Sequence, residues 1–160
     1  MVALRTGAGA MSAKMRAVRI VAASNVSKGD LERRLIQKGE NPDQAKDAVQ
    51  WMSDLELVDD RKTAQQVVQR CISKGYGLSR AKQALYEKRI PREYWQEALM
   101  DYPEQTDTIE AYLQDKLTDP SDRQAVKKAV DALLRRGHSY GSIRRVLDRM
   151  SVNTEEFPEG

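Results

Sequence analysis

The sequence is poor in the residues that build metal, redox and catalytic sites. Its 160 residues include a single cysteine, Cys71, and a single histidine, His138. One cysteine cannot form an internal disulfide, and the two residues together fall short of the about four ligands of a structural zinc site. A nucleophile would need a base held beside it, and the only histidine falls in a predicted turn. We therefore expect no catalytic residue, no metal and no cofactor, and a protein that is not an enzyme.

Long apolar runs and phosphate-binding loops are also missing. No run approaches the roughly 18 apolar residues of a membrane-spanning helix. Basic residues interrupt the N-terminal stretch in which a secretory signal would have its apolar core. The glycine-containing segments GAG and GYG lack the GxxxxGK frame, followed by Ser or Thr, of a nucleotide-binding loop. These absences argue against integral membrane and P-loop proteins, and we expect a cytoplasmic protein without membrane contact.

Charge is distributed in alternating blocks, although the net charge is only +3. The basic blocks 1–39, 61–100 and 123–150 hold 8, 9 and 8 Lys and Arg against 2, 3 and 2 Asp and Glu. The acidic blocks between them, 40–60 and 101–122, each hold one basic residue against seven acidic ones. This pattern favours basic faces at repeated positions that meet a polyanionic or strongly dipolar partner. The alternative is neutralisation between adjacent repeats, and the sequence does not decide between the two.

The chain repeats itself when it is shifted by 50 residues. Apolar positions then fall on apolar positions, for example Val18 on Val68, Val21 on Cys71, Leu35 on Leu85 and Ala48 on Ala98. A second shift, by 62 residues, places Cys71 on Leu133, Gly75 on Gly137, Ala81 on Ile143 and Leu85 on Leu147. Three copies are therefore present. The third ends early, because the sequence after Met150 is polar and acidic and contains Pro158.

Each copy is predicted to form helices, since apolar residues recur at spacings of three and four and strand alternation is absent. In the first copy Ser27 is the predicted N-cap of the second helix, and Gly39 ends that helix with a positive φ. Pro42 opens the third helix, as Pro91 does in the second copy. An additional helix is predicted over 107–117, before the third basic block.

Single copies of this size cannot bury both faces of their helices, so they must stack on neighbours. We therefore expect a monomeric all-α protein of about nine helices, built as tandem three-helix repeats in an elongated, curved array. The expected parts are a disordered N-terminal extension over 1–14, repeats over 15–56, 57–103 and 104–150, and an acidic tail over 151–160. Met11 and Met15 are alternative starts to Met1.

Several conspicuous residues have ordinary structural explanations. Cys71 shares its position in the repeat with apolar residues, which predicts core packing. Asp59 and Asp60 precede a helix, which favours an N-cap and a first-turn acid over a catalytic carboxylate pair. Trp51 and Trp95 lie at apolar or boundary positions, where packing is favoured over base stacking.

The turn KGYG at 74–77 recurs as RGHS at 136–139. Gly75 and Gly137 are predicted to end one helix, and Gly77 or Ser139 to start the next. From the sequence alone, helix termination is a sufficient explanation of these glycines.

The remaining candidate site is the basic surface of the second helix of each copy and of the end of the helix before it. The predicted contacts for a protein partner or DNA are Arg70, Lys74, Lys82, Lys88, Arg89, Arg135, Arg136, Arg144, Arg145 and Arg149. A three-helix unit with a basic helix resembles a DNA-binding helix-turn-helix, in which phosphate contacts supply affinity. The alternative is that Lys and Arg near helix C-termini only interact with the helix dipole and keep the surface soluble.

Ordered motifs along residues 15–150 resemble the bacterial RecX family. They are AVRIV at 17–21, the Ser, Leu, Leu and Lys-Gly pattern over 27–39, LVDD at 57–60, KGYG at 74–77 and RRG with Ser-Tyr over 135–140. LVDD and KGYG, in this order and spacing, are the most specific of them. Thr63 stands where the family usually has an aromatic residue, and Arg89 where it usually has a glycine.

The resemblance implies three tandem three-helix repeats and a non-enzymatic regulator of the RecA recombinase. Members of the family lie along the groove of the RecA filament and limit its strand exchange, ATP hydrolysis and co-protease activity, and some also bind DNA. We therefore expect the RecA filament as the partner, in recombinational DNA repair and the SOS response, with the basic residues of the second and third repeats as contacts. Two alternatives stay open: a module that binds single- or double-stranded DNA directly, and a scaffold for another protein. Whether filaments are capped or disassembled does not follow from the sequence.

Overall fold

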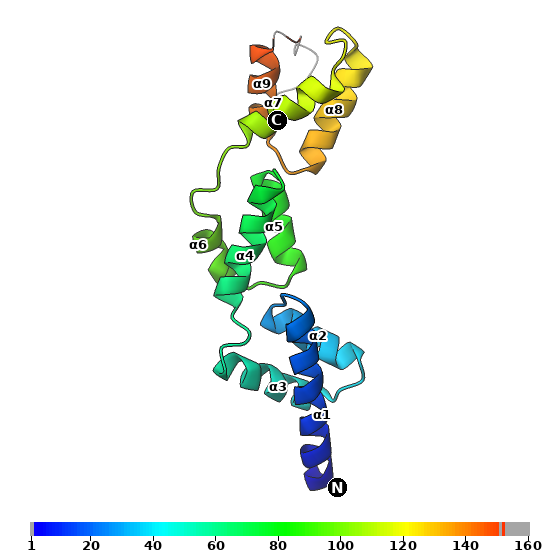
Figure 1. Ribbon diagram of the computed structural model, residues 1–160, viewed down its shortest axis with the longest axis vertical. Coiled ribbons are helices and arrows are strands. Elements are labelled where there is room, and N and C mark those ends of the chain that lie inside the picture. The colour runs from blue at the N-terminus through cyan, green and yellow to red at the C-terminus, as the bar shows by residue number, and fades with distance from the viewer. Residues whose placement is uncertain (1, 151, 153–160) are drawn as a thin grey trace. The chain divides into compact units, whose positions relative to one another are not determined.

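The computed structural model describes residues 2–150 and Val152, with the backbone alone for residues 2–7. This part of the chain contains nine α-helices, one 3-10 turn and no strand (Figure 1). The all-α prediction and the predicted number of helices are confirmed. The elements are α1 Val2–Ala23, α2 Lys28–Gln37, α3 Pro42–Asp54, α4 Asp60–Ser73, α5 Leu78–Glu87, η1 Arg92–Tyr94, α6 Trp95–Leu99, α7 Thr106–Lys116, α8 Arg123–Arg135 and α9 Tyr140–Arg149.

The helices group into two compact units. Unit 1 contains the chain up to residue 67 together with residues 85–98, and unit 2 contains residues 68–84 and the chain from residue 99 onward. The predicted middle repeat, 57–103, is therefore divided, because α4 and α5 each contribute residues to both units. The predicted repeat boundaries and the elongated, curved arrangement stay predictions.

Unit 1 has its core where α1, α2 and α3 pack against one another. Alanines of α1 and α3 are buried there, among them Ala13, Ala17 and Ala45. Their small side chains let the two helices approach closely, and the larger side chains of Leu31 and Leu35 from α2 fill the remaining space. The spacing of apolar residues at three and four thus predicted most of the buried positions, but Val18, which the 50-residue shift aligns with the buried Val68, is 45% exposed.

The disordered extension predicted over 1–14 is corrected by the structure, because α1 is helical from Val2 onward. Alanine, the strongest helix former, recurs in this segment. Ala13 belongs to the core of unit 1. The Ser12 hydroxyl and the Arg16 guanidinium also donate to the buried Glu40 carboxylate, at 2.8 and 2.9 Å, and tie this part of α1 to the start of α3.

The predicted helix ends of unit 1 are confirmed. The Ser27 hydroxyl accepts from the backbone N–H of Asp30 at 3.0 Å, as an N-cap does. Gly39 has a φ of 99°, a conformation that costs other residues energy. Pro42 occupies the first turn of α3, after the capping side chain of Asn41.

The third helix of the middle repeat is shorter than the sequence predicts. It consists of η1 and the five residues of α6. The Trp95 indole N–H donates to the Ile90 carbonyl at 3.0 Å, so Trp95 closes the turn that leads into this segment. Arg89, which replaces the glycine usual at this position, has a φ of 58°. Arginine adopts this left-handed conformation at a cost of about 1–2 kcal/mol, which explains why glycine is usual there.

Unit 2 has its core where α7 packs against α8 and α9. Ile109 and Leu113 of α7, Leu133 of α8 and Leu147 of α9 are almost fully buried in one cluster. α8 and α9 correspond in sequence to the first two helices of the earlier repeats. The predicted additional helix is therefore confirmed, and it packs against both α8 and α9, as α3 packs against both α1 and α2.

Most of the acidic tail predicted over 151–160 lies outside the described residues. The exception is Val152, which is buried against the core of unit 2 and whose backbone N–H donates to the Leu147 carbonyl at 3.0 Å. The fold of unit 2 thus includes this residue.

Candidate interaction surface

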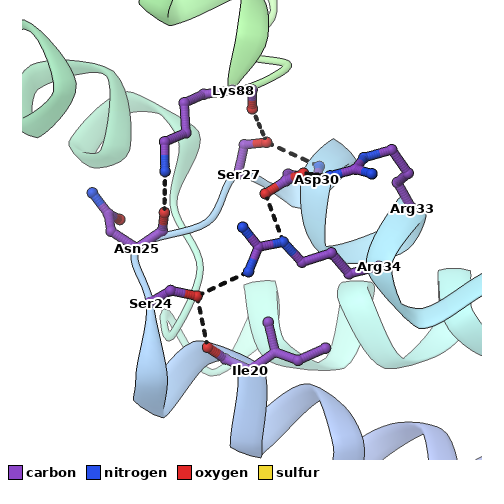
Figure 2. A network of polar contacts seen from close by, with 8 residues as sticks. All are labelled: Ile20, Ser24, Asn25, Ser27, Asp30, Arg33, Arg34 and Lys88. Carbon is purple, nitrogen blue, oxygen red and sulfur yellow. Dashed lines mark hydrogen bonds and ion pairs between the residues drawn. The ribbon is translucent and has the colours of Figure 1, made fainter. Parts of the chain in front are cut away.

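In unit 1 the turn between α1 and α2 is bonded to the end of α5 (Figure 2). The Ser27 hydroxyl donates to the Lys88 carbonyl, and the Lys88 ammonium donates to the Asn25 carbonyl at 3.2 Å. Lys88, which the sequence predicts as a partner contact, is half-buried and is used inside the fold. Of the two predicted contacts in unit 1, Arg89 alone is exposed.

Basic residues of α2 are also neutralised inside unit 1. Asp30 is buried, and its carboxylate binds Arg33 at 2.6 Å and Arg34 at 3.1 Å. The Arg34 guanidinium donates as well to the Ser24 hydroxyl, which donates in turn to the Ile20 carbonyl (Figure 2). Figure 2 shows these side chains converging on the turn, so the first copy offers a partner less positive charge than its sequence suggests.

The two aspartates at the start of α4 have the structural roles predicted for them. The Asp59 carboxylate accepts from the backbone N–H of Arg61 at 3.0 Å, which caps the helix. Asp60 is buried and accepts from the backbone N–H of Lys28 at 2.8 Å. These carboxylates form no catalytic pair in this arrangement.

In unit 2 the two repeated turns, 74–77 and 136–139, dock against each other through their backbones. The N–H of Gly77 donates to the Arg136 carbonyl at 2.9 Å, and the N–H of Ser79 donates to the Gly137 carbonyl at 3.2 Å. A Cβ atom on Gly77 would lie 2.2 Å from the Gly137 oxygen. Gly75 and Gly137 end their helices with φ of 74° and 92°, as predicted. The repeated turns did not reveal this docking in the sequence, and the close approach of the backbones gives Gly77 and Gly137 a second reason to lack a side chain.

The turn 74–77 is also fastened to the segment before α7. The Tyr102 hydroxyl donates to the Tyr76 carbonyl at 2.6 Å, and the Gln105 amide donates to the Ile72 carbonyl at 3.3 Å. Burial, and to a smaller extent Cys71, raises the pKa of Tyr102 to about 12, so its hydroxyl keeps the proton that it donates. Cys71 itself is buried, as predicted.

His138 lies inside the docked turns, as a turn residue that is nearly fully buried. Its imidazole is hydrogen-bonded to the Gly75 backbone, and its Nε2 atom has no partner among the described residues. Burial lowers the pKa of His138, the hydrogen bond to Gly75 opposes this shift, and Arg136 adds to it. The imidazole is therefore held neutral.

The docking of the turns gathers positive charge in unit 2. Residues 68–84 hold four basic residues and no acidic one. The predicted contacts Arg70, Lys74, Lys82, Arg135 and Arg136 are all exposed. None of these five forms an ion pair with a described acidic side chain, and Lys82 lines an open cavity of about 610 Å³ beside the turns. We call these five residues and Arg80 the basic surface of unit 2.

Two tyrosines lie within this basic surface. Lys74 and Arg80 lie over the Tyr76 ring, at 6.0 and 5.4 Å from its centre. Arg136 and Lys116 lie over the Tyr112 ring, at 5.1 and 5.8 Å. The two tyrosines and the cations Arg80 and Lys116 were not among the predicted contacts. Lys116 follows Tyr112 by four residues within α7, which is the spacing of neighbours on a helix, whereas Tyr76 lies in the turn before α5.

The predicted contacts on α9 are partly neutralised. Arg145 binds Glu104 at 3.1 Å, and Arg149 binds Glu110 at 3.5 Å. Arg144 is half-buried and has a contact within the fold. The acidic block 101–122 therefore neutralises part of the third basic block within the predicted third repeat, whereas the alternative that the charge pattern left open was neutralisation between adjacent repeats. Exposed ion pairs of this kind contribute only about 0–1 kcal/mol, so a partner can displace them.

The side chains that the structure describes bring no three His, Cys, Asp or Glu residues together as metal ligands. None of the described helices is long and apolar enough to span a membrane. What the described residues offer is a surface for contact, with charge, hydrogen-bond donors and aromatic rings.

The all-α fold and the three related copies in the sequence define this chain as a helical tandem-repeat protein. Residues 59–99, within the predicted second repeat, match the family described as RecX, second three-helix domain. This match covers the middle part of the chain and agrees with the ordered motifs that resemble RecX.

Solved structures share the fold. The crystal structure of RecX from Lactobacillus salivarius is 19% identical, with a TM-score of 0.75, and the match covers 91% of this chain and 98% of that one. A crystal structure of regulatory protein RecX is 18% identical, with a TM-score of 0.76, and the match covers 92% of this chain and 75% of that one. No curated protein sequence matches the chain significantly.

Proposed function

We propose that this protein binds the RecA recombinase filament and inhibits its ATPase, strand-exchange and co-protease activities. The match of residues 59–99 to the second three-helix domain of RecX is the observation that carries the proposal, and the fold shared with RecX crystal structures supports it. The protein acts in recombinational DNA repair and the SOS response, as a non-enzymatic regulator in the cytoplasm. Several weak contacts from successive helices sum to a strong one on a polymer whose subunits repeat, which is an avidity effect.

The basic surface of unit 2 is the proposed contact with acidic recombinase surface or with the DNA inside the filament. Five of its residues are exposed and have no described acidic partner, and the docked turns hold them together. Charges in such a position steer association and confer specificity. Lys88 is excluded from this contact set because its ammonium is used in unit 1.

The test is a titration of the single-stranded-DNA-dependent ATPase of the cognate recombinase with this protein. A triple variant, Arg70→Glu, Lys82→Glu and Arg135→Glu, is expected to raise the concentration for half-inhibition at least about tenfold. The matched control makes the same charge change at exposed lysines elsewhere, with Lys46→Glu, Lys62→Glu and Lys127→Glu. If the unaltered protein leaves the ATPase unchanged at saturation, the proposed function is wrong. If it inhibits and both triple variants inhibit equally, the basic surface is not the contact.

A second candidate function is direct binding of single-stranded DNA, and the two tyrosines among cations favour it. Bases stack on aromatic rings with about 1–3 kcal/mol each, while the cations bind phosphates. Anisotropy of a labelled oligonucleotide without recombinase tests it. Affinity should fall steeply between low and moderate salt, and Tyr76→Leu with Tyr112→Leu should weaken binding while keeping apolar packing. A flat salt dependence would reject this function and leave the first untouched.

A further inference from the structure

Helix α1 carries a second apolar face that nothing in unit 1 covers. Its buried face, with Ala13 and Ala17, packs into the core. Met11, Met15 and Val18 are nevertheless 60, 51 and 45% exposed, which is high for apolar side chains on a helix that already has a buried face. A surface helix of a globular domain needs only one apolar stripe.

These exposed residues follow the spacing of a coiled-coil seam. The intervals from Met11 to Met15, Val18 and the exposed Ala22 are four, three and four residues, and in the sequence the same spacing continues back through Ala8 to Leu4. Apolar residues at alternating intervals of three and four, the a and d positions of a heptad, form the narrow stripe along which two helices pack. We call Met11, Met15, Val18 and Ala22 the α1 seam.

Positive charge flanks the α1 seam on both sides. Lys14 and Arg19 occupy the positions next to it, which face the flanking positions of a partner helix. Lys14 lies 5.1 Å from the centre of the Trp51 ring. Arg16 points elsewhere, because it is bound to Glu40. Since α1 contains no acidic residue at all, its flanks offer nothing for a basic helix to pair with.

We infer that the α1 seam docks an amphipathic helix of a protein partner whose own apolar seam is flanked by acidic residues. A second copy of α1 fits poorly, because it would place Lys14 and Arg19 against cations of the same kind. A lipid surface fits poorly too, since interfacial helices present broad apolar faces rich in large side chains. The α1 seam offers two positions in seven, which suits one helix. This contact is independent of the basic surface of unit 2 and of the proposed function.

Two synthetic peptides of three heptads test the inference with the full chain. Both have leucine at the seam positions; the acidic peptide has glutamate at the flanking positions, and the basic peptide has lysine. Anisotropy of the labelled peptides should show binding of the acidic peptide at least about tenfold tighter than that of the basic one. Trp51 fluorescence should change on binding of the acidic peptide, because the flanking Lys14 lies beside its ring.

Variants separate the seam from the rest of the surface. Met11→Ser with Met15→Ser and Val18→Ser should weaken binding of the acidic peptide at least about tenfold, since three apolar side chains leave the contact. Their exposure allows these changes without loss of the core. The matched control is Met100→Ser, a methionine that is 65% exposed and lies in unit 2, which should bind like the unaltered protein. Arg19→Glu should weaken binding of the acidic peptide and strengthen binding of the basic peptide.

Three outcomes would overturn the inference. The first is equal binding of the two peptides, or equal binding by the seam variant and the control. The second is binding to phosphatidylserine vesicles that requires the seam while neither peptide binds, which would assign the face to membranes. The third is a dimer in sedimentation that the seam variant dissociates, which would assign it to a second copy. The ATPase titration is unaffected by any of these results, so the two proposals fail separately.

Discussion

The docking of the two repeated turns in unit 2 makes a sharp prediction for Gly77→Ala. A Cβ atom at this position would lie 2.2 Å from the Gly137 oxygen and 2.5 Å from the His138 nitrogen. Both are backbone atoms, which cannot rotate away as a flexible side chain would. The turns must therefore separate, and the two hydrogen bonds that join them, from Gly77 and Ser79, lengthen or break.

The magnitude follows from these contacts. Two backbone hydrogen bonds at about 0.5–1.5 kcal/mol each give a loss of about 1–3 kcal/mol in the free energy of unfolding. The stiffer unfolded chain of alanine offsets about 0.4–1 kcal/mol of it. Gly141 is the matched control, because it lies in the first turn of α9 and a Cβ there meets nothing within 4 Å. Gly141→Ala should stabilise the protein by up to about 1 kcal/mol, through helix propensity alone.

Urea unfolding followed by far-ultraviolet circular dichroism measures both variants. With a slope of about 1–3 kcal/mol/M, the midpoint of Gly77→Ala should fall by roughly half to one molar relative to Gly141→Ala. Trp51 and Trp95 both lie in unit 1, so their fluorescence follows that unit separately. Equal midpoints for the two variants would refute the docking of the turns, since chain entropy and propensity alone make both substitutions favourable.

Three further predictions rest on single side chains. Ser27→Ala should lower the free energy of unfolding by about 1–2 kcal/mol, because it removes the N-cap of α2 and the bond to the Lys88 carbonyl; unchanged thermal unfolding would contradict this. His138 has a lowered pKa in the fold, so the unfolded chain binds the proton first and stability should fall as the pH drops below about 6.5. No other histidine titrates there, and urea midpoints at pH 7.5 and 5.5 should therefore differ less in His138→Gln than in the unaltered protein. Burial raises the pKa of the Cys71 thiol, so a disulfide reagent should react with it slowly in the native protein and rapidly in urea; rapid native labelling would show that the site opens.

Local sequence patterns predicted much of the fold, because helix periodicity, capping and turn formation depend on residues close together in the chain. Ser27, Gly39 and Pro42 act within a few residues of their own positions, and the structure confirms all three at helix ends. The disordered extension was a wrong prediction, because the alanines of this segment favour a helix and Ala13 is buried in the core of unit 1. The apolar pattern also did not predict that the third helix of the middle repeat is short.

The sequence predicted which basic residues lie near the candidate surface, but it did not predict which of them are bonded to other residues of the fold. Charge blocks identified the basic residues around the repeated turns, but Lys88 is bonded to Asn25, and Arg145 and Arg149 are bonded to acidic residues distant in sequence. Pairing of this kind depends on which segments meet in space. The α1 seam shows the converse, because its spacing is visible in the sequence, while only the exposures show that no other part of unit 1 covers it.

The sequence by itself determined most of the helices, their caps and the pattern of three related copies, because periodicity, capping and turn chemistry act over short stretches of chain. Only the tertiary structure decided that the turns at 74–77 and 136–139 bond to each other, that α7 packs against both α8 and α9, and which of the described cations have no acidic partner. The physical reason is that backbone docking and ion pairing join groups that are far apart along the chain. No local pattern specifies which of them will meet.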